Sequence, residues 1–174
     1  MLNYIIVKQS FVNHSFLPLL FLSACAGASF DGQVYRDQDV AFRVGALGAG
    51  WERFRISEAA LAFRHGSSGT IVANAMCKDI DDVPLDVLTN QALFGVNERH
   101  ELGRSDVTLD GRAARRTQVT GTMDGVPVAL DLVVMKKNNC VFDFQLVSSP
   151  ADFAARQTDF VRFISGFANL KSGT

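Results

Sequence analysis

Four long runs separated by very short turn sequences occupy the second half of the chain, and they restrict the possible fold more than any other feature. They extend from about Glu98 to Leu109, Arg112 to Thr122, Val126 to Lys136 and Cys140 to Val147. Two of the three joints contain Asp-Gly, among the strongest signals of a tight hairpin turn, and the third contains Asn-Asn. Strands joined by such short turns are antiparallel neighbours. The sequence therefore predicts an antiparallel meander.

Shorter runs with alternating polarity fill the first half of the chain. They cover residues 40–45, 52–57, 60–66 and 70–77, and small or turn-forming residues separate them. The stretch "HGSSGT" at 65–70 is typical of a hairpin turn, because glycine tolerates the positive φ angles that such turns need. Together with the meander, these runs predict a sheet of about seven to eight antiparallel strands.

Two segments have the apolar spacing of helices. The first starts near Pro84 after a capping Asp81 or Asp82 and stops at Gly95. The second follows Ser149, a typical N-cap residue, and carries several phenylalanines on one stripe. Both helices need an apolar partner, and the sheet is the available one. The fold class predicted is α+β: an antiparallel sheet with a central and a C-terminal helix packed on it.

Residues 1–24 have the composition of a secretory signal, with one basic residue, no acidic residue and an apolar block at 16–22. The block is shorter than the about 20 residues that a membrane-spanning helix needs. The motif Leu22-Ser23-Ala24-Cys25 resembles the bacterial lipobox, which implies cleavage after Ala24 and acylation of Cys25. The alternatives are an ordinary signal peptide with a chance cysteine and a cytoplasmic protein with an apolar N-terminus.

The lipobox resemblance sets the expected organisation of the mature chain. Residues 25–38 are interpreted as a tether, and residues 39–170 as a single domain, because no linker or repeat interrupts them. Ala26, rather than aspartate, follows the cysteine. In the sorting rule of enteric bacteria, this implies a periplasmic protein whose lipid anchor lies in the outer membrane. The membrane is therefore one expected partner.

The charge of the chain argues against a nucleic-acid partner. Its formal net charge is −1, and no basic face is evident in the sequence. The densest positive stretch, "GRAARR" at 111–116, is interpreted as the solvated edge or face of a strand.

Cys77 and Cys140 are the two cysteines that remain beyond Cys25. An even pair in an exported chain indicates a disulfide. Each lies at the end of a predicted strand, and alternation places both thiols on an apolar face. The alternative is two separate buried thiols.

The order of these features resembles the PsbP-like superfamily. The likeness rests on "LGAGWERF", an early hairpin, a helix, strands joined by "LDGRA" and "MDG" turns, and a closing phenylalanine-rich helix, over residues 39–168. The superfamily includes an extrinsic subunit of photosystem II, a nuclear Ran-GTPase release factor and small bacterial lipoproteins. The resemblance implies a PsbP-like α/β sandwich and a role in docking.

The sequence shows no motif for catalysis, for a cofactor or for a metal site. His65 and His100 are isolated, and the aspartates at 79, 81 and 82 lack the spacing of a calcium loop, so helix capping explains them equally well. The glycines of "GALGAG" at 45–50 have the wrong spacing for a nucleotide loop. Trp51 is the one residue we single out as a possible partner contact; the alternative is a lid over the core.

Two classes of function follow from these observations. The first is a non-catalytic binding or assembly module that docks a partner protein of unknown identity at the outer membrane. The second is a small-ligand carrier or an enzyme with a pocket between sheet and helices. An aromatic-lined cavity with convergent polar groups would favour the second class. A packed core with an exposed apolar or acidic patch would favour the first.

Overall fold

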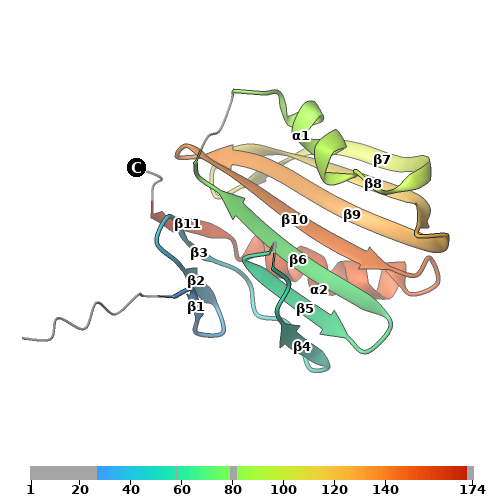
Figure 1. The fold of residues 1–174 in the computed structure, drawn as a ribbon, viewed down its shortest axis with the longest axis horizontal. Helices are drawn as coiled ribbons and strands as arrows, with labels where there is room; N and C mark the ends of the chain where they lie inside the picture. Colours follow the sequence, from blue (N-terminus) through green and yellow to red (C-terminus); the bar gives the residue numbers. More distant parts are fainter. Residues whose placement is uncertain (1–26, 58, 79–81, 172–174) are drawn as a thin grey trace, which may run out of the picture.

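The computed structural model of the protein describes residues 27–57, 59–78 and 82–171. These residues form two antiparallel sheets and two helices, which confirms the predicted α+β class (Figure 1). The elements in chain order are β1 (Ser29–Phe30), β2 (Val34–Arg36), β3 (Ala41–Arg43), β4 (Trp51–Phe54), β5 (Leu61–His65), β6 (Gly69–Met76), α1 (Leu85–Ala92), β7 (Asn97–Leu109), β8 (Arg112–Met123), β9 (Val126–Lys137), β10 (Cys140–Ser148), α2 (Phe153–Ser165) and β11 (Ala168–Lys171).

The large sheet has seven strands in the order β4-β5-β6-β10-β9-β8-β7, and each neighbouring pair is antiparallel. The predicted meander corresponds to the last four strands of this order, β10, β9, β8 and β7. The predicted hairpin turn between β5 and β6 is also present, closed by a hydrogen bond from Ser68 N–H to His65 O at 3.0 Å. Among the described strands of this sheet, the consecutive pair that does not lie side by side is β6 and β7: the chain passes through α1 to the far edge, and the meander then returns so that β10 pairs with β6.

The two helices cover opposite faces of the large sheet (Figure 1). Alternate residues of β9 show this division: Leu132 and Val134 pack in a core that includes Leu88 of α1. Val133 faces the other way, into a larger core that includes Phe163 of α2. Because side chains of a strand alternate between faces, a strand covered on both sides is apolar throughout. This explains the nearly unbroken apolar sequence of β9.

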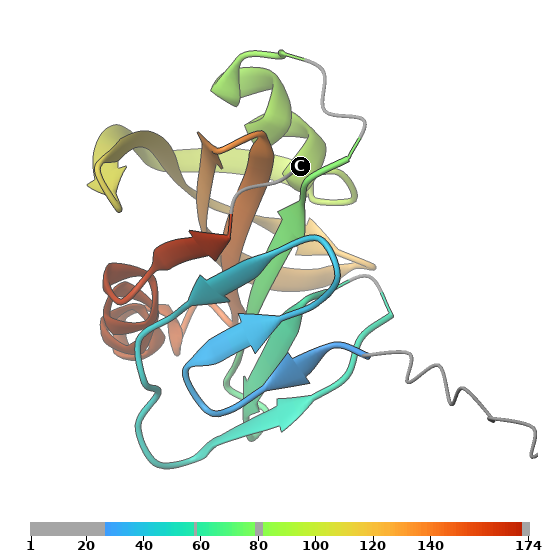
Figure 2. The same ribbon diagram turned by 90° about the vertical axis from the view of Figure 1, so that its left-hand side faces the viewer.

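The small sheet has the order β1-β2-β3-β11 (Figure 2). The segments that form its strands differ from two predictions. Strands β1 and β2 lie inside the segment predicted to be a tether. The Asp31 carboxylate accepts hydrogen bonds from the N–H groups of Gln33 and Val34, which stabilises the turn between them. The run at 40–45 joins this small sheet as β3 rather than the single large sheet that was expected.

Strand β11 follows the closing helix and was not predicted from the sequence. Helix α2 ends at Ser165, because Gly166 follows and the chain then pairs with β3. Strands β1, β2 and β11 are short and pair with β3 or with each other, so local sequence does not reveal them.

Both helices begin later than their predicted caps. Pro84 is the N-cap of α1, and Asp82 instead pairs with a lysine of β9. Ser149 receives a hydrogen bond from Asp152 N–H at 3.1 Å in a turn that precedes α2, and the helix starts at Phe153. Neither helix of the described residues is both long and apolar enough to cross a bilayer.

Candidate functional site

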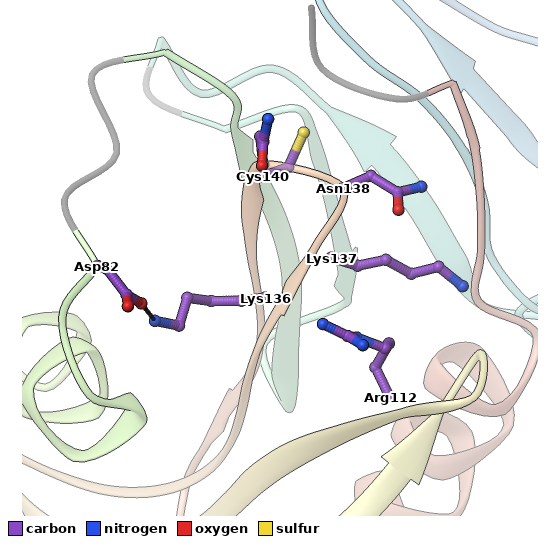
Figure 3. A pocket seen from close by; sticks show the side chains of 7 residues that line it. Asp82, Arg112, Lys136, Lys137, Asn138 and Cys140 are labelled. Carbon is purple, nitrogen blue, oxygen red and sulfur yellow. Dashed lines mark hydrogen bonds and ion pairs between the residues drawn. The ribbon is translucent and has the colours of Figure 1, made fainter.

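A polar hollow of about 520 Å³ lies at the end of the large sheet, where the β9–β10 turn approaches the start of β8 (Figure 3). It is open to solvent. Three of its side chains are cationic and two are amides. The lining residues are Asp82, Arg112, Lys136, Lys137, Asn138, Asn139 and Cys140.

Two tight turns place these residues together. Asp110 and Gly111 between β7 and β8, and Asn138 and Asn139 between β9 and β10, all have positive φ angles, as two-residue hairpin turns of the favoured type require. Both turns lie at the same end of the sheet because consecutive hairpins alternate between its two ends.

The register of β8 and β9 determines which cations meet. Ala114 lies opposite Met135, and the same register continued by two residues brings Arg112 opposite Lys137. Like charges in this arrangement repel one another. The repulsion is reduced when carboxylates or a bound anion lie beside the cations.

Lys136 is engaged on the α1 side of the hollow. Its Nζ donates to the Asp82 carboxylate at 2.6 Å and to the carbonyl of Val83 at 2.7 Å (Figure 3). The hydrogen bond from Lys136 lowers the pKa of Asp82 from its usual value. This ammonium group therefore holds the start of the α1 segment against β9.

Lys137 is engaged on the other side, with the Asp110 carboxylate at 2.6 Å and the Asp110 carbonyl at 2.6 Å. The same carboxylate accepts the backbone N–H of Asn169 in β11 at 2.8 Å. Burial raises the pKa of Asp110, but the hydrogen bonds from Lys137 and Asn169 outweigh it, and the pKa is lowered overall. The pair thus connects the two sheets.

Arg112 is the exception in the hollow. Its side chain is exposed, and no carboxylate pairs with it within residues 27–57, 59–78 and 82–171. In the view of Figure 3 its guanidinium lies below the side chain of Lys137, whereas the side chain of Lys136 points away toward Asp82. A guanidinium presents a planar fork of donors that matches carboxylate and phosphate oxygens. The arrangement is therefore suited to binding an anionic group.

A disulfide closes one side of the hollow. The Sγ atoms of Cys77 and Cys140 are bonded and the two Cα atoms are 4.1 Å apart, so the predicted pairing is present. Met76 pairs with Val141 in the β6–β10 ladder, which places the two cysteines opposite each other one residue further on. Cys140 is buried while Cys77 is partly exposed, so the bond ties the end of β6 to the turn beside the cations.

The other arginines of the 111–116 stretch are already paired. Arg115 bonds Asp86 of α1 and Asp106 of β7, and the hydrogen bond to Asp106 raises the Arg115 pKa. Arg116 donates twice to the fully buried Asp131 beneath α2. Of this stretch, only Arg112 fits the predicted description of a solvated strand residue.

Trp51 lies at the edge of the larger core rather than in the hollow. It is partly buried, its indole N–H donates to the Asp159 carboxylate of α2 at 3.1 Å, and its ring meets that of His65 edge-on. These contacts match the interpretation as a lid; a role in partner contact stays a prediction. Ala24 and Cys25, the predicted cleavage and acylation residues, lie outside the described residues, as do Asp79 and Asp81.

The sequence reasoning missed Lys136 and Lys137 as site residues. The available signal was the pair of tight turns, since a hairpin closed at 124–125 places residues 112 and 137 opposite each other. Within the described residues, no three His, Cys, Asp or Glu side chains gather at a distance that would hold a metal ion.

Neither a protein-family model nor a curated protein sequence matches this chain. Solved structures do match it. Cyanobacterial PsbP (CyanoP) from Synechocystis sp. PCC 6803 is similar, with a TM-score of 0.55 and 13% identity, over 85% of this chain and 98% of that chain.

LpqN, a protein involved in cell envelope biogenesis of Mycobacterium tuberculosis, is similar with a TM-score of 0.54 and 20% identity, over 76% of this chain and 86% of its own. A structure from Bacteroides thetaiotaomicron is similar with a TM-score of 0.55 and 13% identity, over 75% of this chain and 45% of that chain. At these identities the likeness concerns the fold alone. The arrangement of sheet, central helix and closing helix, together with the match to CyanoP, shows that this domain has the PsbP-like fold.

Proposed function

We propose that this protein is a lipid-anchored lipoprotein of the bacterial periplasm, and that its PsbP-like domain is a non-catalytic module that docks a partner protein at the outer membrane. The cationic hollow is the docking site in this proposal. It receives an acidic group of the partner, and Arg112 is the residue that contacts it.

The anchor and the compartment are supported by two independent features. The lipobox-like motif ends at Cys25, and two acyl chains hold a protein on a membrane far more firmly than one. The Cys77–Cys140 disulfide is typical of chains that fold in an oxidising compartment, as the periplasm is.

The observation that carries the docking site is the free charge of Arg112. Two of the three cations in the hollow have carboxylate partners within the described residues, and the third does not. A guanidinium with no carboxylate partner among the described residues, in a hollow whose two ammonium groups are paired, favours an anion from another molecule. Arginine is also enriched among the residues that dominate protein–protein interfaces.

A small-ligand carrier is the second candidate, and the size of the hollow favours it. Its volume of about 520 Å³ lies within the range of sites for small molecules. Its lining is cationic and amide rather than aromatic, and the aromatic rings of Phe42, Phe142 and Phe144 are fully buried in the core. These features favour docking of an exposed anionic group over enclosure of a ligand.

The test is capture from native membranes by the full-length protein, with cross-linking and identification of what co-purifies. Arg112→Glu should lower the recovery of a specific partner at least about tenfold, since it replaces attraction by repulsion at the centre of the site. Arg99→Glu is the matched control, because Arg99 is an exposed arginine of β7 that does not line the hollow. Equal recovery with all three proteins would exclude the hollow as the docking site.

The anchor is tested separately with Cys25→Ser. Wild-type protein should incorporate labelled palmitate and sediment with membranes, and the variant should do neither. A Cys25→Ser protein that is acylated and membrane-bound like the wild type contradicts the anchor. A small anion retained by the purified domain, with no protein captured, would support the carrier instead.

A further inference from the structure

The folded domain starts very close to the proposed acylation site. Gly27 is the first described residue and β1 begins at Ser29, so only Ala26 separates Cys25 from the described chain. A fully extended chain spans about 3.5 Å per residue, which limits the Cα separation of Cys25 and Gly27 to about 7 Å in any conformation. The surface around Gly27 must therefore remain next to whatever holds Cys25.

The surface around Gly27 is a groove of about 400 Å³ between the small sheet and the segment after β4. Its lining includes Gly27 itself, Arg53, Arg55 and Ile56. Both arginines are exposed, and Ile56 is 39% exposed, one of eight exposed large apolar side chains among the described residues. Cationic and apolar side chains side by side are what the headgroup region of a membrane accommodates.

The two arginines are placed to meet anions outside the domain. The Arg53 guanidinium lies over the ring of Phe30 of β1, 5.0 Å from its centre, which holds it on the face that β1 presents. No ion pair is formed by Arg53 or Arg55 with a carboxylate of the described residues. Arg64 of β5, by contrast, pairs with Glu52.

We infer that this groove is the membrane-facing surface of the domain, in which Arg53 and Arg55 contact the phosphate groups of the lipids that surround the anchor and Ile56 enters the interface. The inference rests on the lipid anchor of the proposed function. Its occupant is the lipid surface, because the chain leaves the domain at the groove and is inserted into that surface two residues earlier.

A position near the opposite edge of the large sheet serves as the distant comparison for a measurement at the groove. β4 and β7 are the two edges of the large sheet, and neighbouring strands lie about 4.8 Å apart, so the edges are roughly 29 Å apart. Phe94 lies in the turn between α1 and β7, three residues before that strand begins, and is 91% exposed. If the groove faces the bilayer, residue 94 lies far from it.

The test uses the mature lipidated protein in vesicles of phosphatidylethanolamine and phosphatidylglycerol that carry a spin label on the headgroup. A fluorophore is attached at Ser57→Cys, beside the groove, or at Phe94→Cys; the native Cys77 and Cys140 are bonded to each other. Quenching at residue 57 should exceed quenching at residue 94 at least about threefold, since contact quenching does not extend across the sheet width estimated above. Equal quenching, or the reverse order, overturns the inference.

Charge reversal tests the role of the arginines. The double variant Arg53→Glu, Arg55→Glu should lower quenching at residue 57 at least about twofold, because each cation near an anionic surface adds to the attraction. Arg64→Glu is the control, since the side chain of Arg64 points to the other face of the sheet. Unchanged quenching in the double variant contradicts the contacts of Arg53 and Arg55 with lipid phosphates. Protection of residue 57 from the quencher by a purified partner protein also contradicts them, because the groove would then bind a protein.

Palmitate labelling of the same protein separates the two proposals. Lipidated protein with equal quenching at both positions contradicts the orientation alone. Protein that carries no acyl chain contradicts the anchor and the orientation together.

Discussion

The carboxyl group of Asp110 connects three parts of the domain at a single residue. It accepts Lys137 Nζ of β9 and the N–H of Asn169 of β11, and it lies in the turn between β7 and β8. These contacts are charge-assisted and partly buried, which makes them stronger than an exposed ion pair. The carboxylate is therefore important both for the hollow and for the attachment of the small sheet.

Asp110→Asn should lower the free energy of unfolding at neutral pH by about 2 kcal/mol, as loss of a charge-assisted hydrogen bond does. Asparagine tolerates the positive φ of this turn, so the change isolates the charge. Because the pKa of Asp110 is lowered in the folded state, its contribution is present above the unfolded value of 3.8 and is lost as the pH falls through the folded value.

Denaturant melts between pH 7 and pH 2 measure this difference. The wild type and the variant should differ at pH 7 and converge at the acid end. A constant difference across the range would show that the charge of Asp110 is not its source.

At the scale of elements, helix α2 is fixed to the segment that follows β3 by a close approach of two backbones. Gly45 N–H donates to the carbonyl of Phe163 at 2.8 Å, and a side chain at Gly45 would collide with the backbone of Arg162. Gly166 approaches the Gly45 backbone from the other side in the same way. Two glycines are needed because no Cβ fits between the helix end and the segment after β3.

Gly45→Ala should lower the free energy of unfolding by about 3 kcal/mol, because the backbone of α2 must shift to admit the methyl group. Gly103→Ala in β7 is the control, since its added carbon would lie 3.8 Å from the nearest atom, Gln118 Oε1. Chemical denaturation of both variants tests this prediction. Equal stability of the two would contradict a tight contact at Gly45.

Elements with a strong local signal were predictable from the sequence, and those that depend on distant partners were not. The Asp-Gly and Asn-Asn turns specify tight hairpins by themselves, so β7 to β10 were correctly predicted. Strands β1, β2 and β11 are short and pair only with β3 or with each other, so the two strands at 29–30 and 34–36, inside the expected tether, could not be predicted from local sequence. The glycines of "GALGAG" showed no local purpose, because the contact of Gly45 is with a helix far along the chain.

The hollow was predictable only in part, for a related reason. Arg112 belongs to a stretch whose charge density is visible in the sequence. Its position opposite Lys137 depends on the register of the β8–β9 hairpin. The ion pair of Asp82 with Lys136 depends on the path of the segment that leads into α1. The disulfide was predictable because strand alternation and the redox compartment pointed to the same pair.

At the scale of the whole molecule, the disulfide links the two halves of the large sheet's sequence. Cys77 ends the part that contains β4 to β6, and Cys140 follows the meander of β7 to β9. The loop that the bond closes spans 63 residues. In the chain-entropy model, a crosslink of this span stabilises a domain by about 4 kcal/mol.

Reduction of the disulfide should therefore lower the melting temperature by roughly 10 °C for a domain of this size. The double variant Cys77→Ser, Cys140→Ser should melt like the reduced wild type and should not respond to a reducing agent. Calorimetry with and without dithiothreitol measures both. Two free thiols titrated in the denatured, air-purified domain would contradict the bond.

The small sheet combines the first and last parts of the described chain, which affects how the protein is made. β3 lies between β2 and β11, and Arg43 Nε donates to the carbonyl of Gly166, 123 residues later. Contacts between such distant residues form slowly, because the entropy of closing the chain must be overcome first. A chain delivered across a membrane from its N-terminus would expose the free edge of β3 until its final residues emerge. Such an edge pairs readily with other chains, so under the proposed function the period of export is the one in which the protein most needs protection from aggregation.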